Sequence, residues 1–360
     1  MNTLSEDNYH FLLNNNLLRK LSSATRNDVT PLVIWLDEML EKWNEPHRHY
    51  HTIKHLDYIL GVLKYWPKIL DQETREELAI IALFHDIIYD SRSQNNEEAS
   101  AEFFMSSTHD VESTGTSRSF IRHAILDTKT HRSNDKISNL FFELDLWELS
   151  HGTWPQLLKM EREIFLEYQF VPYDVYKTKR IEILTQLMPM VNNNSNMVLY
   201  IEYLSSFRPH IGVYAGSFDP FHLGHLNILQ KAEKLFDKVI IAVATDPSKS
   251  SDEPLNRKRL LEKQLPCHQI DIVEKFLTNH IRVIEGVADI TLIRGLRNGY
   301  DLSYEMNLLR YMEDQYNELK VVWIPCDRKY EYVSSRDLRG LGKIEEGSEL
   351  SYLPQQNSAK

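Results

Sequence analysis

Residues 216–225 read GSFDPFHLGH, and this stretch decides the fold of the second half of the chain. It follows a short apolar run that begins at Ile211 and leads into an amphipathic pattern over residues 223–235. A strand that ends in a glycine turn and passes into a helix gathers backbone N–H groups and the positive end of the helix dipole, which favours a bound phosphate. His222 and His225 stand on this turn, where imidazole N–H groups can donate hydrogen bonds to phosphate oxygens.

Short apolar runs separated by turns recur after this stretch and predict four more strands. They cover residues 238–244, 269–273, 290–293 and 321–324, with helical patterns between them. Strands that alternate with helices form a parallel sheet covered by helices. We therefore expect a doubly wound α/β domain.

Cationic and hydroxyl side chains follow the predicted strands. Lys249 comes after the second strand, Arg294 and Arg297 follow the fourth, and residues 330–336 follow the fifth. Open parallel sheets bind ligands in the crevice outside the carboxyl ends of their strands. A solvated surface charge is the simpler interpretation of any one of these residues, but together they predict an anion site beside the glycine turn.

The composition differs between the two halves of the chain. Nine of the 12 glycines lie after residue 206, whereas five of the six tryptophans and ten of the 15 histidines lie before it. The first half carries amphipathic helical patterns throughout, for example over residues 74–89. We therefore expect two domains, an all-α helical bundle over residues 1–205 and the α/β domain over residues 206–360.

Length, charge and cysteine content exclude several classes of protein. The 360 residues are 42% hydrophobic, which is enough to build folded cores. A net charge of −11 argues against a broad basic face for nucleic acid, and two cysteines are too few for a disulfide framework. No apolar run is long enough to span a membrane, and residues 1–15 are too polar for a signal peptide. We expect a soluble cytoplasmic protein.

Four segments of the second half carry a resemblance to a known family. They are GSFDPFHLGH, DPSKS at 246–250, RGLRNGYDLSYEMNL at 294–308 and YVSSRDLR at 332–339. Through them, residues 211–350 resemble the bacterial phosphopantetheine adenylyltransferases of the nucleotidyltransferase superfamily. The resemblance implies transfer of AMP from ATP to 4′-phosphopantetheine in coenzyme A biosynthesis, giving dephospho-coenzyme A and pyrophosphate. It also implies that Mg²⁺ accompanies ATP.

The resemblance also implies roles for individual residues. His225 matches the histidine that stabilises the transition state, Ser217 contacts nucleotide and acceptor, and Lys249 and Arg294 match the cations that hold the acceptor phosphate. The implied nucleotide-binding residues are Ser217, Phe218, His222, His225, Gly295, Leu296, Arg297, Glu305, Tyr330, Ser334, Ser335 and Arg336.

Three of these positions depart from the family's pattern. His222 and Ser217 stand where threonine is usual, and Arg336 stands where a small hydroxyl residue is usual. Arg336 either clamps a phosphate or blocks the close approach of its loop. Another acceptor, such as nicotinamide mononucleotide, therefore stays open as an alternative. In a further alternative, one half of the chain is a regulatory module that senses a nucleotide. A homo-oligomer is compatible with the sequence.

The first half contains a candidate metal site. His51 and His55 share a helix face, His85 and Asp86 are adjacent in an apolar helical pattern, and Asp145 lies in a later one. Burying a histidine and an aspartate is costly unless a cation or hydrogen bonds match them. Imidazole and carboxylate together suit Mn, Fe, Zn or Mg in a hydrolase. The plain alternative is that histidines cluster by chance near residues 46–49.

This ordered set of residues resembles the HD superfamily of metal-dependent phosphohydrolases over residues 5–190. The resemblance implies an HD-type helical bundle that precedes the nucleotidyltransferase domain. It also implies that His55, His85, Asp86 and Asp145 are metal ligands. His51 resembles the histidine that serves as a general acid in cyclic-nucleotide phosphodiesterases. Further candidates for contacts with the ligands or the substrate are Glu97, Glu98, His123 and His131. Nothing in the sequence names the phosphoester.

Overall fold

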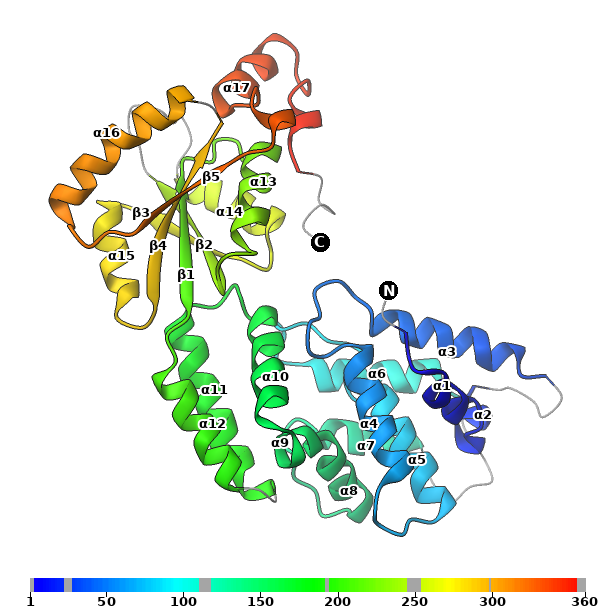
Figure 1. Ribbon diagram of the computed structural model, residues 1–360. Coiled ribbons are helices and arrows are strands. Elements are labelled where there is room, and N and C mark those ends of the chain that lie inside the picture. The colour runs from blue at the N-terminus through cyan, green and yellow to red at the C-terminus, as the bar shows by residue number, and fades with distance from the viewer. Residues whose placement is uncertain are drawn as a thin grey trace. The chain divides into compact units, whose positions relative to one another are not determined.

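The computed structural model describes residues 3–22, 28–109, 118–191, 194–244, 254–297 and 299–354. Two compact units make up the structure (Figure 1). The first unit contains residues Met1–Glu167 and Glu182–Glu202, and the second contains residues Tyr168–Ile181 and Tyr203–Lys360. The expected domain limits, 1–205 and 206–360, stay a prediction. The two units are not divided at one point in the chain, since residues 168–181 belong to the second unit.

The N-terminal region is helical, as the amphipathic patterns predicted. Its helices are α1 (Glu6–Leu13), α2 (Asn16–Leu21), α3 (Thr30–Lys42), α4 (Ile53–Tyr65), α5 (Gln72–Phe84), α6 (Asn96–Ser107), α7 (Arg118–Asp127), α8 (Lys136–Asp145), α9 (Trp147–His151) and α10 (Trp154–Glu167). Two further helices, α11 (Tyr173–Leu187) and α12 (Asn194–Ser206), follow, with the short turn η1 (Met188–Met190) between them.

Helix α5 forms the centre of the core in the first unit. Every residue from Leu78 to Phe84 is fully buried, so this helix is apolar on all sides over its last two turns. At its other end, the Asp71 side chain accepts a hydrogen bond from the Thr74 amide and caps the first turn. The predicted helix over residues 74–89 was too long, because α5 ends at Phe84 and His85 is its C-terminal cap. The chain turns there and leaves His85 and Asp86 at the helix end.

The second unit is built on a parallel sheet of five strands. The strands are β1 (His210–Gly216), β2 (Lys238–Ala244), β3 (Gln269–Val273), β4 (Asp289–Leu296) and β5 (Val321–Pro325). Their order in the sheet is β3-β2-β1-β4-β5, and every neighbouring pair is parallel. All five predicted strands are present, but β4 is longer than the predicted 290–293 and includes Arg294, which was expected to follow the strand. The apolar side chains of β1 and β2 are buried, as expected for central strands of a covered sheet.

Helices cover both faces of this sheet (Figure 1). Helices α13 (Leu223–Ala232) and α14 (Pro254–Gln264) lie on one face, and α15 (Leu277–Glu285) and α16 (Gly299–Gln315) lie on the other. The last elements are η2 (Arg328–Tyr330), α17 (Ser335–Ile344) and η3 (Leu350–Tyr352). The chain continues from β1 toward β2 and later returns to β4 on the other side of β1. Such a reversal opens a ligand crevice at the carboxyl ends of the strands beside it.

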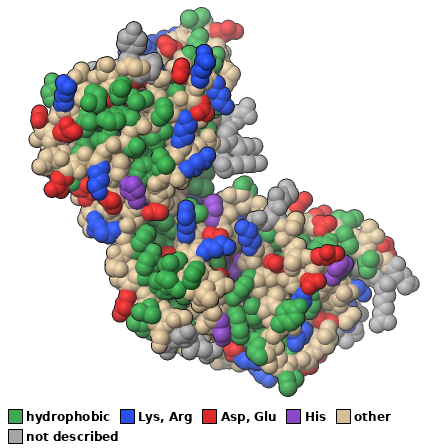
Figure 2. Space-filling view, viewed as in Figure 1, with side chains coloured by type: hydrophobic (Ala, Val, Ile, Leu, Met, Phe, Trp, Pro, Cys, Tyr) green, Lys and Arg blue, Asp and Glu red, His purple; other side chains and the backbone are tan. Residues whose placement is uncertain are grey.

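Two general features of the surface bear on function. Among the described residues, no helix combines the length and the apolar character that crossing a membrane requires. Acidic and basic side chains are interspersed on the face drawn in Figure 2. This face therefore shows no large patch of a single charge.

Candidate functional site

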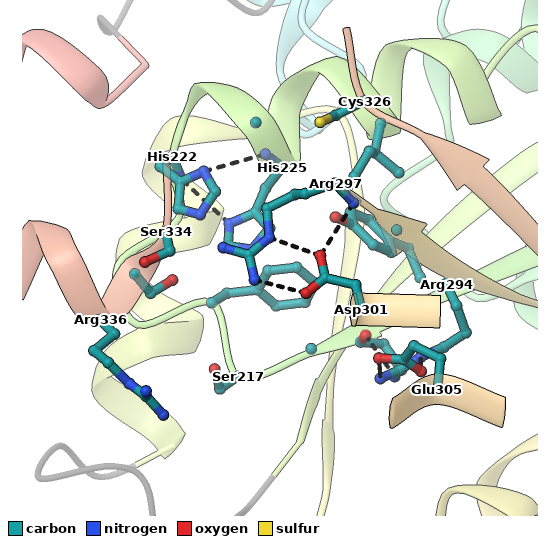
Figure 3. Close-up of a pocket in the computed structure, with 18 of the residues that line it drawn as sticks. Ser217, His222, His225, Arg294, Arg297, Asp301, Glu305, Cys326, Ser334 and Arg336 are labelled. Atoms are coloured by element: carbon teal, nitrogen blue, oxygen red, sulfur yellow. Dashed lines mark hydrogen bonds and ion pairs between the residues drawn. The ribbon is translucent and has the colours of Figure 1, made fainter. Parts of the chain in front are cut away.

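A cavity of about 830 Å³ opens at the carboxyl ends of β1 and β4. The turn after β1, the start of α13, the end of β4, the first turns of α16 and the start of α17 line it (Figure 3). The helices α13 and α17 both direct their N-terminal ends into this cavity, since His222 and Ser334 are their N-caps and both line it. Two helix N-termini at one cavity favour an anion, because their unpaired N–H groups carry partial positive charge.

His222 and His225 hold each other in place at the start of α13. The Nδ1 atom of His222 accepts a hydrogen bond from the His225 amide at 3.4 Å, and the Nδ1 atom of His225 accepts one from the His222 amide at 3.3 Å. The two rings stack with their centroids 3.7 Å apart. Because each Nδ1 is an acceptor, each ring keeps its proton on Nε2. Both histidines are therefore preset as neutral donors through Nε2.

The surroundings of these two rings oppose protonation. Burial, and then the charge of Arg297, lower the pKa of His222 to about 4. Burial, His222 and Arg297 together hold the pKa of His225 well below its ordinary value. Both rings are therefore uncharged near neutral pH, so each can offer an anion a hydrogen bond but no positive charge.

Carboxylates hold three of the four arginines that line the cavity. Arg294 forms a two-point ion pair with Glu305, at 2.5 and 2.6 Å, and Arg297 forms one with Asp301, at 2.9 and 3.0 Å. Arg339 pairs with Asp219. Arg336 has no carboxylate partner among the described residues, and its side chain extends away from these pairs in Figure 3. It is therefore the arginine that can meet an anion without giving up an ion pair.

Arg257 on α14 ties the turn after β1 to the end of β2. Its side chain is buried, and Nη1 donates to the carbonyl oxygens of Ser217 at 2.5 Å and Ala244 at 3.2 Å. A buried guanidinium bonded to two strand ends fixes the floor of the cavity. Sequence reasoning missed this role, because Arg257 is one of several basic residues in a polar helix.

The first unit brings four of its predicted metal ligands together. His55 comes from α4, His85 and Asp86 from the end of α5, and Asp145 from the end of α8. Asp145 Oδ1 lies 3.2 Å from His55 Nε2 and 3.6 Å from His85 Nε2, and His85 Nε2 lies 3.2 Å from Asp86 Oδ2. Ligand atoms around one ion at about 2.1 Å lie about 3 to 3.5 Å apart, so these spacings fit a single cation.

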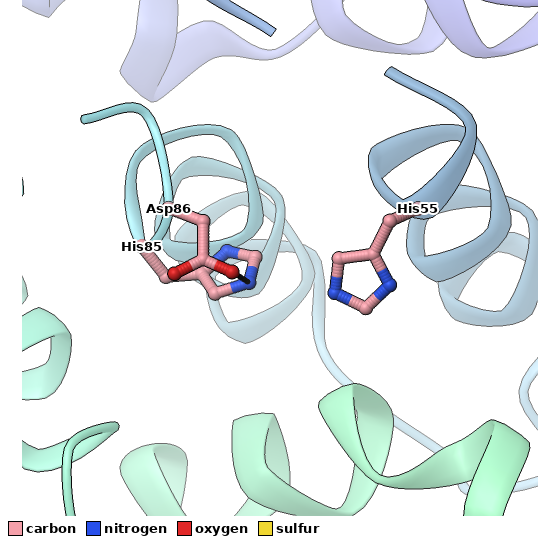
Figure 4. Close-up of side chains that lie close together, drawn as sticks. All are labelled: His55, His85 and Asp86. Atoms are coloured by element: carbon pink, nitrogen blue, oxygen red, sulfur yellow. Dashed lines mark ion pairs between the residues drawn. The ribbon is translucent and has the colours of Figure 1, made fainter. Parts of the chain in front are cut away.

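The His85 ring is prepared to accept such an ion. Its Nδ1 atom donates to the Ala82 carbonyl at 2.9 Å, so in the neutral ring, the form that binds a metal ion, the lone pair lies on Nε2. That Nε2 atom is buried and has no well-aligned hydrogen-bond partner among the described atoms. Figure 4 shows His55, on a separate helix, with its ring directed toward His85 and Asp86. Arg48 stabilises the turn after α5, because its guanidinium donates hydrogen bonds to the carbonyl oxygens of Asp86 and Ile87.

His51 lies beside this cluster and is held by Glu167. Its Nε2 atom is 4.0 Å from Asp86 Oδ2, and its Nδ1 atom is 2.7 Å from Glu167 Oε2. The fully buried Glu167 carboxylate also accepts hydrogen bonds from the amides of residues 49–51 and from the Tyr89 hydroxyl. The charge of His51 and these hydrogen bonds outweigh the effect of burial and lower the pKa of Glu167 to about 2. Sequence reasoning missed Glu167, which is the last residue of the amphipathic helix α10 and matches no motif.

The other candidates in the first unit lie in different surroundings. His131 is in the cluster, because its Nε2 atom lies 2.9 Å from Asp145 Oδ2. His123 is exposed and bonds to Ser119 on its own helix, so it lies outside the cluster. Glu97 and Glu98 pair with Lys129.

Comparison with known proteins identifies the second unit. A family model described as cytidylyltransferase-like matches residues 213–340. A phosphopantetheine adenylyltransferase of Streptococcus pneumoniae strain JJA is 34% identical over 148 residues, which cover 40% of this chain and 90% of that protein. The chain belongs to the cytidylyltransferase-like family. Its C-terminal part is a nucleotidyltransferase domain homologous to the phosphopantetheine adenylyltransferases.

Further comparisons cover the same share of the chain. The phosphopantetheine adenylyltransferase of S. pneumoniae strain Hungary19A-6 is 35% identical over 136 residues, covering 37% of this chain and 84% of that protein. The crystal structure of a putative nicotinate-nucleotide adenylyltransferase from Vibrio parahaemolyticus is 21% identical, with a TM-score of 0.32, and covers 42% of this chain and 97% of that one. The family match lies within the C-terminal part, so the HD resemblance of the first unit stays a hypothesis.

Most of the residues expected in this nucleotidyltransferase site line the cavity. Those that do are Ser217, Phe218, His222, His225, Arg294, Gly295, Arg297, Glu305, Ser334, Ser335 and Arg336. Leu296 and Tyr330 do not line it, and Lys249 lies outside the described residues. Lining residues that sequence reasoning missed include Tyr214, Cys326 and Arg339. Cys326 follows β5 directly, so the rule that ligands meet strand ends would have found it.

Proposed function

We propose that the second unit transfers AMP from ATP to 4′-phosphopantetheine. One observation carries the proposal: the histidine pair, Arg294 and Arg297 at the end of β4 and the start of α17 line one cavity, in a domain 34% identical to a phosphopantetheine adenylyltransferase. In this reaction an acceptor phosphate oxygen attacks the α-phosphorus of ATP. A new P–O–P bond forms, the bond between the α-phosphorus and the bridging oxygen to the β-phosphate breaks, and pyrophosphate leaves with that electron pair.

The residues at hand suit this reaction without a general base. The acceptor phosphate is already ionised and nucleophilic, so positioning and charge stabilisation are sufficient. His225 donates through Nε2 to the α-phosphate as its charge shifts, and Arg294 holds the acceptor phosphate. On this proposal Mg²⁺ enters bound to ATP; two of the lining carboxylates, Asp301 and Glu305, are already paired with arginines.

The test is an acceptor screen with the full chain, ATP and Mg²⁺. We expect pyrophosphate release with 4′-phosphopantetheine and a product with the mass of dephospho-coenzyme A. Nicotinamide mononucleotide is the competing acceptor, and His225→Ala is the control for a contaminating activity. Release of pyrophosphate with nicotinamide mononucleotide alone would replace the proposed acceptor while keeping the reaction class.

We also propose that the first unit is a metal-dependent phosphohydrolase. The cluster of His55, His85, Asp86 and Asp145 supports this proposal, because two imidazoles and two carboxylates in a buried setting suit a divalent cation. When bound, a metal such as Mn, Fe, Zn or Mg would supply a Lewis acid and an activated water. His51, oriented by Glu167, is placed to give a proton to the leaving oxygen.

Elemental analysis of the full chain tests this second proposal. We expect a divalent metal in the purified protein and its loss in Asp86→Ala, together with the loss of any activity on phosphomonoesters and phosphodiesters. Adenylyl transfer in the same variant controls for general damage. A folded protein that takes up none of Mn, Fe, Zn or Mg would leave the cluster as a structural set of polar residues.

A further inference from the structure

His131 occupies an unusual place beside the metal cluster. It lies in the turn between α7 and α8, with a backbone φ of 50°, in the left-handed region that residues with a Cβ seldom adopt. Such a conformation persists where the surrounding structure holds it, and it clusters at functional sites. Its side chain is mostly buried and reaches Asp145, with 2.9 Å between His131 Nε2 and Asp145 Oδ2.

The turn that carries His131 is tied down on the side of α7. The Thr128 hydroxyl donates to the Ile125 carbonyl at 2.7 Å, and Lys129 reaches across to the Gln94 carbonyl and to Glu98. On the other side, Asp135 caps α8 by accepting from two amides. The position of His131 relative to α8 is therefore set by several independent contacts.

The two oxygens of Asp145 have different partners. Oδ1 faces His55 and His85, at 3.2 and 3.6 Å, whereas Oδ2 faces His131. The terminal torsion of an aspartate is broad, so the side chain alone does not decide which way its carboxylate turns. A hydrogen bond to Oδ2 fixes that rotation and directs Oδ1 into the cluster. Because an ionised carboxylate only accepts hydrogen bonds, His131 must donate through Nε2.

We propose that His131 is a positioning residue that orients Asp145 as a single-oxygen metal ligand. The inference rests on the proposed metal site and adds a residue outside the set of four ligands. In metal sites generally, a partner that hydrogen-bonds a ligand sets its direction and its basicity, and removing that partner weakens metal binding about 10- to 100-fold. His131 therefore acts on the ion through Asp145 and does not touch it.

The experiment is a titration of the metal-free full chain with Co²⁺, followed by calorimetry and by the visible absorption of the bound ion. Three variants separate the contributions. His131→Gln keeps a donor near the position of Nε2, His131→Ala removes the donor, and His131→Gly removes it while relieving the left-handed backbone. The control is His123→Ala, which removes the exposed histidine of α7.

We expect one Co²⁺ per chain in every protein. The dissociation constant should rise about 10- to 100-fold in the alanine and glycine variants, stay within about threefold in the glutamine variant and remain unchanged in the control. A glutamine variant as weak as the alanine variant, with a changed Co²⁺ spectrum, would make His131 a ligand and overturn the positioning role. Equal affinity in all proteins would also overturn it. If the parent protein binds no Co²⁺, the metal site itself fails.

Discussion

Removing the Glu167 carboxylate should loosen the segment that carries His51. Glu167 Oε1 accepts hydrogen bonds from the amides of residues 49, 50 and 51, at 2.8, 2.8 and 2.9 Å. Glu167 Oε2 accepts hydrogen bonds from His51 Nδ1 and from the Tyr89 hydroxyl. Glu167→Ala leaves three amides without an acceptor. An amide that loses its acceptor costs about 1 to 3 kcal/mol of stability when it is buried. We take about 1 kcal/mol for each of the three amides, because these residues are partly exposed. The local cost is therefore about 3 kcal/mol.

Hydrogen exchange measures this cost directly in the full chain. Because about 1.4 kcal/mol corresponds to tenfold, the amides of residues 49–51 should exchange about 100-fold faster in Glu167→Ala. Glu167→Gln keeps a carbonyl oxygen for the amides and loses only the charge, so the increase should be about tenfold or less. Glu163→Gln, one turn earlier on α10, is the matched control for charge. Unchanged exchange at residues 49–51 in Glu167→Ala would refute the reasoning.

The same carboxylate makes the first unit sensitive to acid. The pKa of Glu167 in the folded protein, about 2, lies below its ordinary value of 4.5. Its stabilisation is therefore fully present above pH 4.5 and is lost as the pH falls toward 2. We expect the free energy of unfolding to fall less steeply with acid in Glu167→Gln than in the parent protein. Tryptophan fluorescence reports on this unit, which contains five of the six tryptophans. Identical pH slopes would contradict the assignment.

Three predictions concern the nucleotidyltransferase cavity. His225→Ala should lower kcat by about 100-fold or more, with a smaller change in ATP affinity, because it removes a donor aimed at transition-state charge. The pKa of His222 is about 4 and that of His225 lies well below its ordinary value of 6.5, so neither ring should gain a proton between pH 6.5 and 8, and kcat should not fall through protonation of either histidine in that range. Arg336→Ser should raise the KM for ATP about tenfold if the arginine clamps a phosphate, whereas Arg259→Ser, on the exposed part of α14, should not. Steady-state kinetics of pyrophosphate release checks all three.

The fold of the second unit was predictable because each of its signals is local. Short apolar runs bounded by turns mark strands, and each of the five runs lies within an observed strand. The end of α5 was not predictable in the same way. The apolar pattern continues through Ile87 and Ile88, but the chain leaves the helix at His85. Periodicity reports which side chains are buried, and residues beyond a helix end can be buried too.

The sequence allowed us to predict many of the residues that form the two sites, but few of the hydrogen bonds and ion pairs between them. Arg297 and Asp301 are four residues apart on the sequence, so their pairing is visible there. Glu167 and His51 are separated by 116 residues, and no short-range rule connects them. The mutual capping of His222 and His225 depends on which ring nitrogen faces which amide. Such details follow from tertiary packing, which a motif leaves open.

The ion pairs around the cavity bear on the choice of acceptor. On the proposed function, the acceptor phosphate has to compete with Glu305 for Arg294, which the carboxylate already holds at two points. The side chains of Arg294 and Glu305 are mostly buried, so the competing pair is poorly screened by solvent. A phosphate group alone then gains little binding free energy at Arg294, because it must displace the Glu305 carboxylate. An acceptor that also buries a long chain in the cavity gains additional binding energy that offsets the lost ion pair. This geometry favours a large phosphorylated acceptor over a small one and predicts that inorganic phosphate inhibits weakly.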